Sequence, residues 1–200
     1  MSKTVEFYFD FGSPNAYIAY HALPDIAHRQ GAAIDFRPCL LGGVFKSTGN
    51  KSPFEAYGAV QAKMAYESVD MQRFLTHYGL SRFTFNPNFP VNTILLMRGM
   101  LWAQKADRVE DYIAAGFAAM WEDGQAMGDA EVFAKVMSEH GLPGEEILAA
   151  TQDPAIKEAL FDVTAKAVER GIFGIPTFFV GEDMYFGKDR LWMVEEALKR

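Results

Sequence analysis

The first residues of the chain alternate between apolar and more polar side chains. Within residues 4–9, the side chains of Val5, Phe7 and Phe9 fall on one side of an extended backbone. A period of two predicts a strand with one buried face. The stretch AAIDFRP, at residues 32–38, predicts a second strand.

A helix is predicted between these two strands. Ser13 and Pro14 form a typical helix start, because serine caps the first turn and proline is tolerated at the first helical position. Apolar residues then recur at helical spacing, and Gly31 is a typical helix end. A β–α–β order requires a crossover connection, so we expect the two strands to be parallel neighbours.

The pattern changes after the second strand. Residues 40–53 are rich in glycine and polar side chains and are predicted to form a loop. From about residue 53 to residue 170 the apolar spacing is mostly helical, with one interruption at the proline-rich stretch FTFNPNFPVN, residues 83–92. The clearest helix of this region follows Asp153, a capping residue, and continues to about residue 170.

The end of the chain returns to short strands. IPTFFV predicts a buried strand, GED a tight turn and MYF a returning strand, and a last helix follows. This order favours an α/β protein in which both ends of the chain form one sheet. We therefore expect a discontinuous thioredoxin-like domain from residues 1–40 and 171–200, interrupted by an inserted helical domain at 41–170, with the 153–170 helix at the junction.

Composition and charge exclude several classes of function. Half of the 200 residues are apolar and the formal net charge is −7, which argues against a protein that binds the nucleic-acid backbone. No segment approaches the roughly 20 apolar residues of a membrane-spanning helix, and the N-terminus lacks a signal-peptide pattern. Cys39 is the single cysteine, so an internal disulfide and a cysteine-rich zinc site are excluded. A single cysteine suits the reducing cytoplasm, where we expect the protein to be found. No histidine pair has the spacing of metal ligands, so we expect no metal site.

Three motifs together carry a resemblance to a known family. They are FYFDFGSPNAY, GIFGIPTFFV and FGKDRL, supported by LLGGVFKSTGN and FPVNT. Their order and spacing resemble the 2-hydroxychromene-2-carboxylate isomerases, which are relatives of the kappa-class glutathione transferases in the DsbA-like branch of the thioredoxin fold. The resemblance implies a DsbA-like thioredoxin domain with a large all-helical insertion, and it covers essentially the whole chain.

The first motif differs from the disulfide oxidoreductases of this fold. Their strand-to-helix turn carries Cys-Pro-x-Cys, whereas residues 13–16 of this chain are Ser-Pro-Asn-Ala. A serine cannot replace the attacking thiolate of disulfide exchange. The resemblance implies that glutathione supplies the thiol and that the Ser13 hydroxyl donates to its sulfur beside the helix N-terminus. The alternative is that Ser13 is an ordinary helix cap.

The resemblance also assigns residues to the rest of glutathione. Pro176 is expected to follow a cis peptide bond, with the backbone of Ile175 pairing with the tripeptide like an added strand; a plain strand edge is the alternative. The residues expected at the γ-glutamyl end are Phe186, Gly187, Lys188 and Asp189. Asp189 would accept from the ammonium group, and backbone N–H groups around Gly187 and Lys188 would bind the carboxylate. Asp189 is also a suitable helix cap.

Two loops carry polar residues suited to an aromatic acid. Lys46 and Asn50 lie in the glycine-rich segment, and Asn88 and Asn92 lie in the proline-rich one. A lysine and amide donors suit the carboxylate and phenolic oxygens of the substrates that the resemblance implies. The alternative for all four residues is ordinary surface-loop chemistry.

The resemblance implies a glutathione-dependent cis–trans isomerase that converts 2-hydroxychromene-2-carboxylate to trans-o-hydroxybenzylidenepyruvate, or a related unsaturated aromatic acid. Two alternatives stay open at this point: a kappa-like glutathione transferase, and a non-catalytic domain that binds glutathione. The oligomeric state is also open, with a homodimer through the helical segment among the options.

Overall fold

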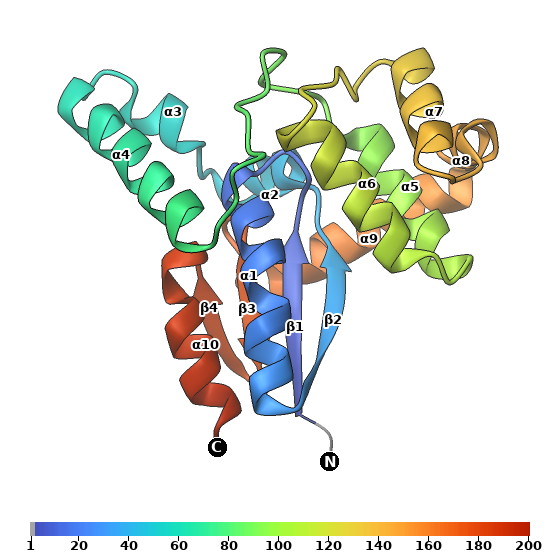
Figure 1. Ribbon diagram of the computed structural model, residues 1–200. Helices are drawn as coiled ribbons and strands as arrows, with labels where there is room; N and C mark the ends of the chain where they lie inside the picture. Colours follow the sequence, from blue (N-terminus) through green and yellow to red (C-terminus); the bar gives the residue numbers. More distant parts are fainter. Residues whose placement is uncertain (1–2) are drawn as a thin grey trace.

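We describe the protein from a computed structural model that covers residues 3–200, and its centre is a four-stranded mixed sheet (Figure 1). The strands are β1 (Lys3–Phe9), β2 (Ala32–Pro38), β3 (Thr177–Val180) and β4 (Asp183–Phe186), in the order β2–β1–β3–β4. β1 pairs in parallel with β2 and antiparallel with β3, which pairs antiparallel with β4. Both ends of the chain therefore share one sheet, which confirms the predicted thioredoxin-like class.

Helices cover both faces of this sheet (Figure 1). α1 (Pro14–Gln30) and α10 (Leu191–Leu198) pack against each other on one side, and a short 3₁₀ helix, η1 (Lys188–Arg190), leads into α10. α9 (Pro154–Glu169) contacts β2 from the other side. Ser13 is the N-cap of α1 and Gly31 its C-cap, with a φ of 61° that favours glycine. Both predicted ends of this helix are thus confirmed.

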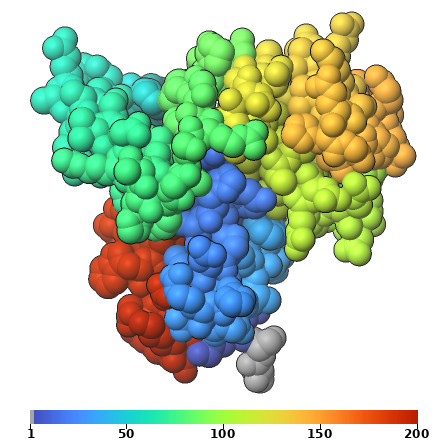
Figure 2. Space-filling view, in the orientation of Figure 1, coloured from blue at the N-terminus to red at the C-terminus, as the bar shows by residue number. Residues whose placement is uncertain are grey.

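Seven helices lie between β2 and α9 in the chain: α2 (Leu41–Thr48), α3 (Pro53–Tyr57), α4 (Gln61–His77), α5 (Ile94–Lys105), α6 (Val109–Trp121), α7 (Ala130–Glu139) and α8 (Gly144–Ala150). They form the upper part of the molecule in Figures 1 and 2, with α3 and α4 projecting to one side. α9 contacts α2 and α5 as well as β2. The domain boundaries and a homodimer through this helical segment stay predictions.

The prediction of a loop at residues 40–53 was wrong for its first part, which forms α2. The backbone N–H of Leu41 donates to the Asp10 carboxylate at 2.7 Å, and that of Leu40 donates to the Thr164 hydroxyl at 3.1 Å. These distant side chains satisfy the first N–H groups of the helix, which a single sequence does not reveal. Gly43 permits close packing, since an added Cβ would lie 3.0 Å from the methyl group of Thr164.

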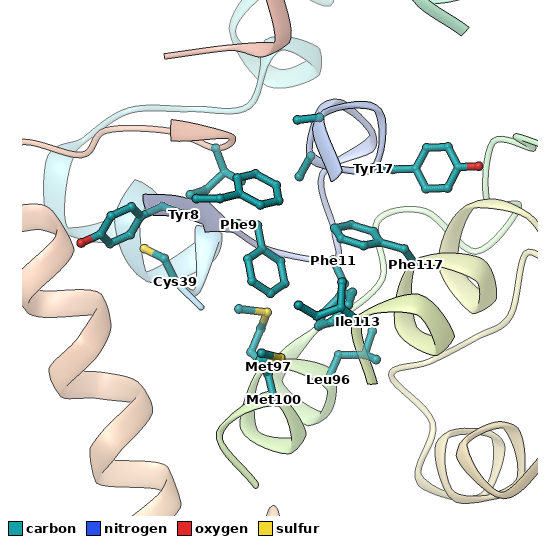
Figure 3. Packing of buried hydrophobic residues seen from close by; sticks show 14 of the residues in the cluster. Tyr8, Phe9, Phe11, Tyr17, Cys39, Leu96, Met97, Met100, Ile113 and Phe117 are labelled. Carbon is teal, nitrogen blue, oxygen red and sulfur yellow. The ribbon is translucent and has the colours of Figure 1, made fainter. Parts of the chain in front are cut away.

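One aromatic core joins the sheet to the inserted helices (Figure 3). The Phe7 ring stacks on Phe178 across β1 and β3, with 5.3 Å between the ring centroids. Beyond the end of β1, the Phe11 ring packs on Phe117 of α6 at 4.9 Å. Figure 3 shows Phe9 and Phe11 directed toward Met97 of α5 and its neighbours. The turn that follows β1 is therefore held between the sheet and the helices.

An ion pair on the sheet gives a testable dependence of stability on pH. Burial alone would raise the pKa of Glu6, but Arg170, whose Nη1 lies 2.6 Å from its carboxylate, holds that pKa below its ordinary value of 4.5. The stabilisation is therefore complete above about pH 4.5 and is lost as the pH falls. We expect Arg170→Met to lower the free energy of unfolding by about 1 kcal/mol at pH 7 and by less at pH 3.

Urea unfolding at the two pH values measures this difference. Lys135→Met is the matched control, because Lys135 forms an ion pair with Glu139 that is exposed to solvent. Its stability should stay close to that of the wild type at both pH values. An Arg170→Met deficit of equal size at pH 7 and pH 3 would contradict the assignment of the effect to the carboxylate of Glu6.

Candidate active site

Ser13 lies where β1 ends and α1 begins. Its hydroxyl oxygen accepts from the backbone N–H of Ala16 at 3.2 Å and donates to the carbonyl of Ile175 at 3.4 Å. Its own N–H donates to the Asp10 carbonyl at 3.1 Å. Ser13 therefore caps α1 and also contacts the segment before β3, so the helix-cap interpretation is correct and does not exclude a role in a site.

The segment before β3 contains a cis peptide bond between Ile175 and Pro176, as the resemblance predicted. The Pro176 carbonyl accepts from the N–H of Gly187 at 2.9 Å. Gly187 has a φ of 96°, and an added Cβ would lie 2.5 Å from the Asp189 carboxylate. The N–H of Gly187 is thus already paired within the protein, and the binding of a carboxylate by backbone N–H groups around Gly187 and Lys188 stays a prediction.

The side chain of Lys188 points into the protein rather than toward solvent. Its Nζ lies 3.0 Å from a carboxylate oxygen of Asp70 and 4.1 Å from the ring centroid of Phe74, both on α4. Lys188 thereby attaches α4, the projecting helix, to the turn before α10. This contact matters because Leu75 is the one buried residue of α4 within the described chain. Asp189 is exposed and forms an ion pair with its neighbour Arg190.

Phe186 and Asn50 both meet Phe173, which lies two residues before Ile175. The Phe186 and Phe173 rings are tilted, with 4.6 Å between their centroids, and both are partly exposed. Asn50 donates from Nδ2 to the Phe173 carbonyl at 2.7 Å. The fold thus brings Asn50, from the end of the α2 segment, to the segment that Ser13 also contacts.

The other residues proposed for substrate binding lie in more ordinary surroundings. Lys46 is exposed on α2, a helix rather than the predicted loop. Asn88 donates to the Gly124 carbonyl at 3.0 Å, and Asn92 accepts from the Ile94 N–H at 3.0 Å at the start of α5. Asn88 therefore joins its loop to the segment after α6, and Asn92 supports the start of α5, although both residues are exposed.

Sequence reasoning missed two buried carboxylates near the turn. Asp10 is 1% exposed and accepts from the backbone N–H groups of Gly12 and Leu41. Glu122 accepts from the Tyr17 hydroxyl at 3.0 Å and pairs with Arg82 at 2.8 Å. An acidic residue within the apolar run FYFDF was the available signal for Asp10. The partners of Glu122 are distant in sequence and gave no comparable signal.

Burial governs the protonation of the groups around the turn. It raises the pKa of Asp10, while hydrogen bonds from Gly12, Leu41 and Thr93 act in the opposite direction. It also raises the pKa of the Tyr17 hydroxyl, with Glu122 adding to the effect.

In residues 3–200 no three His, Cys, Asp or Glu side chains gather as a metal site would require. No helix in that range is long and apolar enough to cross a bilayer.

The native thiol of Cys39 is expected to be unreactive. Burial, followed by the nearby charge of Asp10, raises its pKa to about 12, and the side chain is 0% exposed. At pH 8 we expect iodoacetamide to modify the folded protein at least about a hundredfold more slowly than the urea-unfolded chain, because the thiolate is the reacting form. Mass spectrometry measures both rates. Rapid modification of the folded protein would mean that Cys39 is accessible to a site.

Comparison with known proteins places this geometry in a family. The model of the DSBA-like thioredoxin domain matches residues 4–199. The 2-hydroxychromene-2-carboxylate isomerase of Pseudomonas putida is 31% identical over 98% of this chain and 94% of its own. The crystal structure of an isomerase of that name superposes with a TM-score of 0.84, at 31% identity over 98% of this chain and 94% of the other.

A more distant relative comes from the transferases. Human glutathione S-transferase kappa 1 is 23% identical over 99% of this chain and 92% of its own. The family match over nearly the whole chain and the two full-length matches at 31% identity agree. The chain therefore belongs to the 2-hydroxychromene-2-carboxylate isomerase family, among the DSBA-like proteins of the thioredoxin fold.

Proposed function

We propose that the protein is a glutathione-dependent cis–trans isomerase of an unsaturated aromatic acid, of the type that converts 2-hydroxychromene-2-carboxylate to trans-o-hydroxybenzylidenepyruvate. The observation that carries the proposal is the placement of the Ser13 hydroxyl. It lies at the N-terminus of a 17-residue helix and reaches the carbonyl before the cis-proline, in a chain whose one cysteine is buried elsewhere. Relatives that carry the isomerase name support the same reaction.

The residues around Ser13 suit the thiol end of glutathione. The Ser13 hydroxyl has one proton to donate, and its present bond to the Ile175 carbonyl is long, at 3.4 Å. The N-terminus of α1 adds a partial positive charge that favours an anion. Asn15 has a buried Oδ1 without a hydrogen-bond partner among the described residues, which leaves an acceptor for a ligand donor beside this turn.

When bound, glutathione supplies a thiolate that adds reversibly to a conjugated double bond and so permits rotation. The protein's part is to favour the ionised thiol, whose pKa in a free cysteine-like group is about 8.5. A hydrogen bond from Ser13 and the end of α1 supply one to two pKa units, each worth about 1.4 kcal/mol. A lower thiol pKa also makes the sulfur a better leaving group, which a reversible reaction requires.

The remaining assignments follow the family resemblance and the contacts around the turn. Ile175 and Pro176 present their backbone to the tripeptide, and the exposed Asp189 accepts from its ammonium group. Lys188 acts through its backbone, because its side chain pairs with Asp70. Phe186 forms one wall with Phe173. Substrate oxygens are held by Lys46, Asn50, Asn88 and Asn92. Of these, Asn50 donates to the Phe173 carbonyl, two residues before Ile175.

Product analysis with and without glutathione tests the proposed function. The purified protein is incubated with 2-hydroxychromene-2-carboxylate, and the isomers are separated by chromatography while glutathione is quantified. We expect isomerisation that depends on glutathione and leaves its amount unchanged. The human kappa-class relative favours a second candidate, a glutathione transferase. A stable glutathione conjugate would favour that candidate, and bound glutathione with an unaltered thiol pKa would favour a non-catalytic binding domain.

A single buried cysteine suits the reducing cytoplasm, where we place the protein.

A further inference from the structure

Asp10 occupies an unusual position for an acidic residue. It lies between Phe9 and Phe11, which Figure 3 shows packed in the core, and it is 1% exposed. Within residues 3–200 it has no lysine, arginine or histidine partner at ion-pair distance, and the Cys39 thiol is the titratable group that its charge affects. A buried carboxylate without a cation costs stability unless several hydrogen bonds compensate it.

The carboxylate accepts two backbone hydrogen bonds and lies beside a threonine hydroxyl, and these three neighbours come from three segments of the chain. Oδ1 accepts from the N–H of Gly12 at 2.8 Å, in the turn before Ser13. Oδ2 accepts from the N–H of Leu41 at 2.7 Å, at the first residue of α2. The third neighbour is Thr93, the residue before α5, whose hydroxyl acts on the carboxylate as a donor that lowers its pKa. Asp10 thus joins the turn of Ser13 to the two segments that carry the residues proposed for substrate binding.

The turn itself is packed tightly against these partners. A Cβ added at Gly12 would lie 3.1 Å from the methyl group of Thr93 and 3.4 Å from the Asp10 carboxylate. The Asp10 carbonyl accepts from the N–H of Ser13 at 3.1 Å. Asp10 therefore holds two consecutive residues of the turn, one through its side chain and one through its backbone.

We propose that Asp10 is a positioning residue for the Ser13 site: its carboxylate fixes the Gly12–Ser13 turn against α2 and α5, and so sets the direction in which the Ser13 hydroxyl meets a bound thiol. This inference rests on the proposed function. Stability alone is a poor reason for the group, because a buried charge contributes less than well-packed apolar side chains of similar size. A fixed donor direction is a better reason, since a hydrogen bond weakens steeply when its angle departs from linear.

The test is an ultraviolet titration of the thiol of bound glutathione against pH. Asp10→Asn keeps the size of the side chain but cannot accept from all three donors. Thr93→Val removes only one donor and keeps the shape. We expect both variants to raise the pKa of the bound thiol by about one unit, which is a loss of thiolate of up to about tenfold at neutral pH. kcat should fall in proportion, while the KM for glutathione changes less. Thr93→Ser keeps the hydroxyl and should leave the pKa of the bound thiol close to that of the wild type.

Thr164→Val is the matched control. The Thr164 hydroxyl accepts from the Leu40 N–H at 3.1 Å and so secures the start of α2 without touching the Gly12–Ser13 turn. We expect this variant to lose stability and to keep the wild-type pKa of the bound thiol. The comparison separates loosening of α2 from a change in the turn.

Each other outcome overturns the inference in a recognisable way. If Asp10→Asn and Thr93→Val lower the melting temperature but leave the pKa of the bound thiol unchanged, Asp10 has a structural role alone. If Asp10→Asn lowers that pKa, its charge acts directly on the sulfur and does not position Ser13. In both cases a wild-type shift that Ser13→Ala reduces leaves the proposed function intact. A wild-type protein whose bound thiol has the free pKa overturns both proposals.

Discussion

Replacing Ser13 by alanine is expected to raise the pKa of the bound glutathione thiol by about one unit, toward the value of about 8.5 in a free cysteine-like group, while the end of α1 keeps part of the shift. At pH 7 this change leaves a minor fraction of the thiol ionised. Loss of the donor also removes a charge-assisted hydrogen bond that strengthens as the sulfur regains its negative charge on leaving. Together these effects lower kcat for isomerisation by about a hundredfold.

The chain contains a matched control for the loss of a helix cap. Ser52 and Pro53 begin α3 as Ser13 and Pro14 begin α1, and the Ser52 hydroxyl accepts from the Glu55 N–H at 3.2 Å. Ser52→Ala removes a cap of the same kind, at a cost of about 1 kcal/mol or less on an exposed helix. We expect it to leave the pKa of the thiol and kcat unchanged. A Ser13→Ala variant with a wild-type thiol pKa would refute the role given to the hydroxyl.

Local signals in the sequence explain which elements were predictable. β1 shows a period of two because one of its faces meets the aromatic core, and α1 carries both of its caps within its own sequence. α2 carries no such signal, because the groups that satisfy its first N–H donors come from Asp10 and Thr164, which are 31 and 124 residues away. A pair of glycines then favours a loop when the sequence is considered alone.

The same distinction applies to the site. The proximity of Ser13 to the cis-proline segment follows from the fold, so recognising the family was enough to predict it. Whether an individual polar group is free to bind a ligand depends on its tertiary contacts. The N–H of Gly187 pairs with Pro176, and the ammonium of Lys188 pairs with Asp70 from a helix 118 residues earlier. No pattern within FGKDRL indicates either pairing. The partners of Asp10 lie in three separate motifs, at Gly12, Leu41 and Thr93, and nothing within those motifs indicates that they meet.

Gly99→Ala is expected to be among the most destabilising small substitutions in the protein. Alanine in a helix interior ordinarily gains about 1 kcal/mol over glycine. Here an added Cβ would lie 2.1 Å from the hydroxyl oxygen of Tyr112, a fully buried residue that donates to the Leu96 carbonyl at 2.9 Å. The ring must move within a packed core, so we expect a net loss of roughly 3 kcal/mol in the free energy of unfolding, measured by urea denaturation. Gly42→Ala, which meets open space in α2, is the control and should not destabilise.

A double-mutant cycle identifies the cause of that loss. Tyr112→Phe removes the hydroxyl that the new methyl group meets first, although the ring carbon behind it, at 2.8 Å, still restricts the space. Gly99→Ala should therefore cost at least about 1 kcal/mol less in the Tyr112→Phe background than in the wild type, because residues in direct contact are not additive. Additive effects would mean that the added methyl group is strained against another residue, for example Ile147 of α8, whose methyl group lies 3.0 Å from the same added Cβ. Ile147→Ala, which removes that methyl group, would then reduce the cost of Gly99→Ala, whereas contact with Tyr112 predicts that it does not.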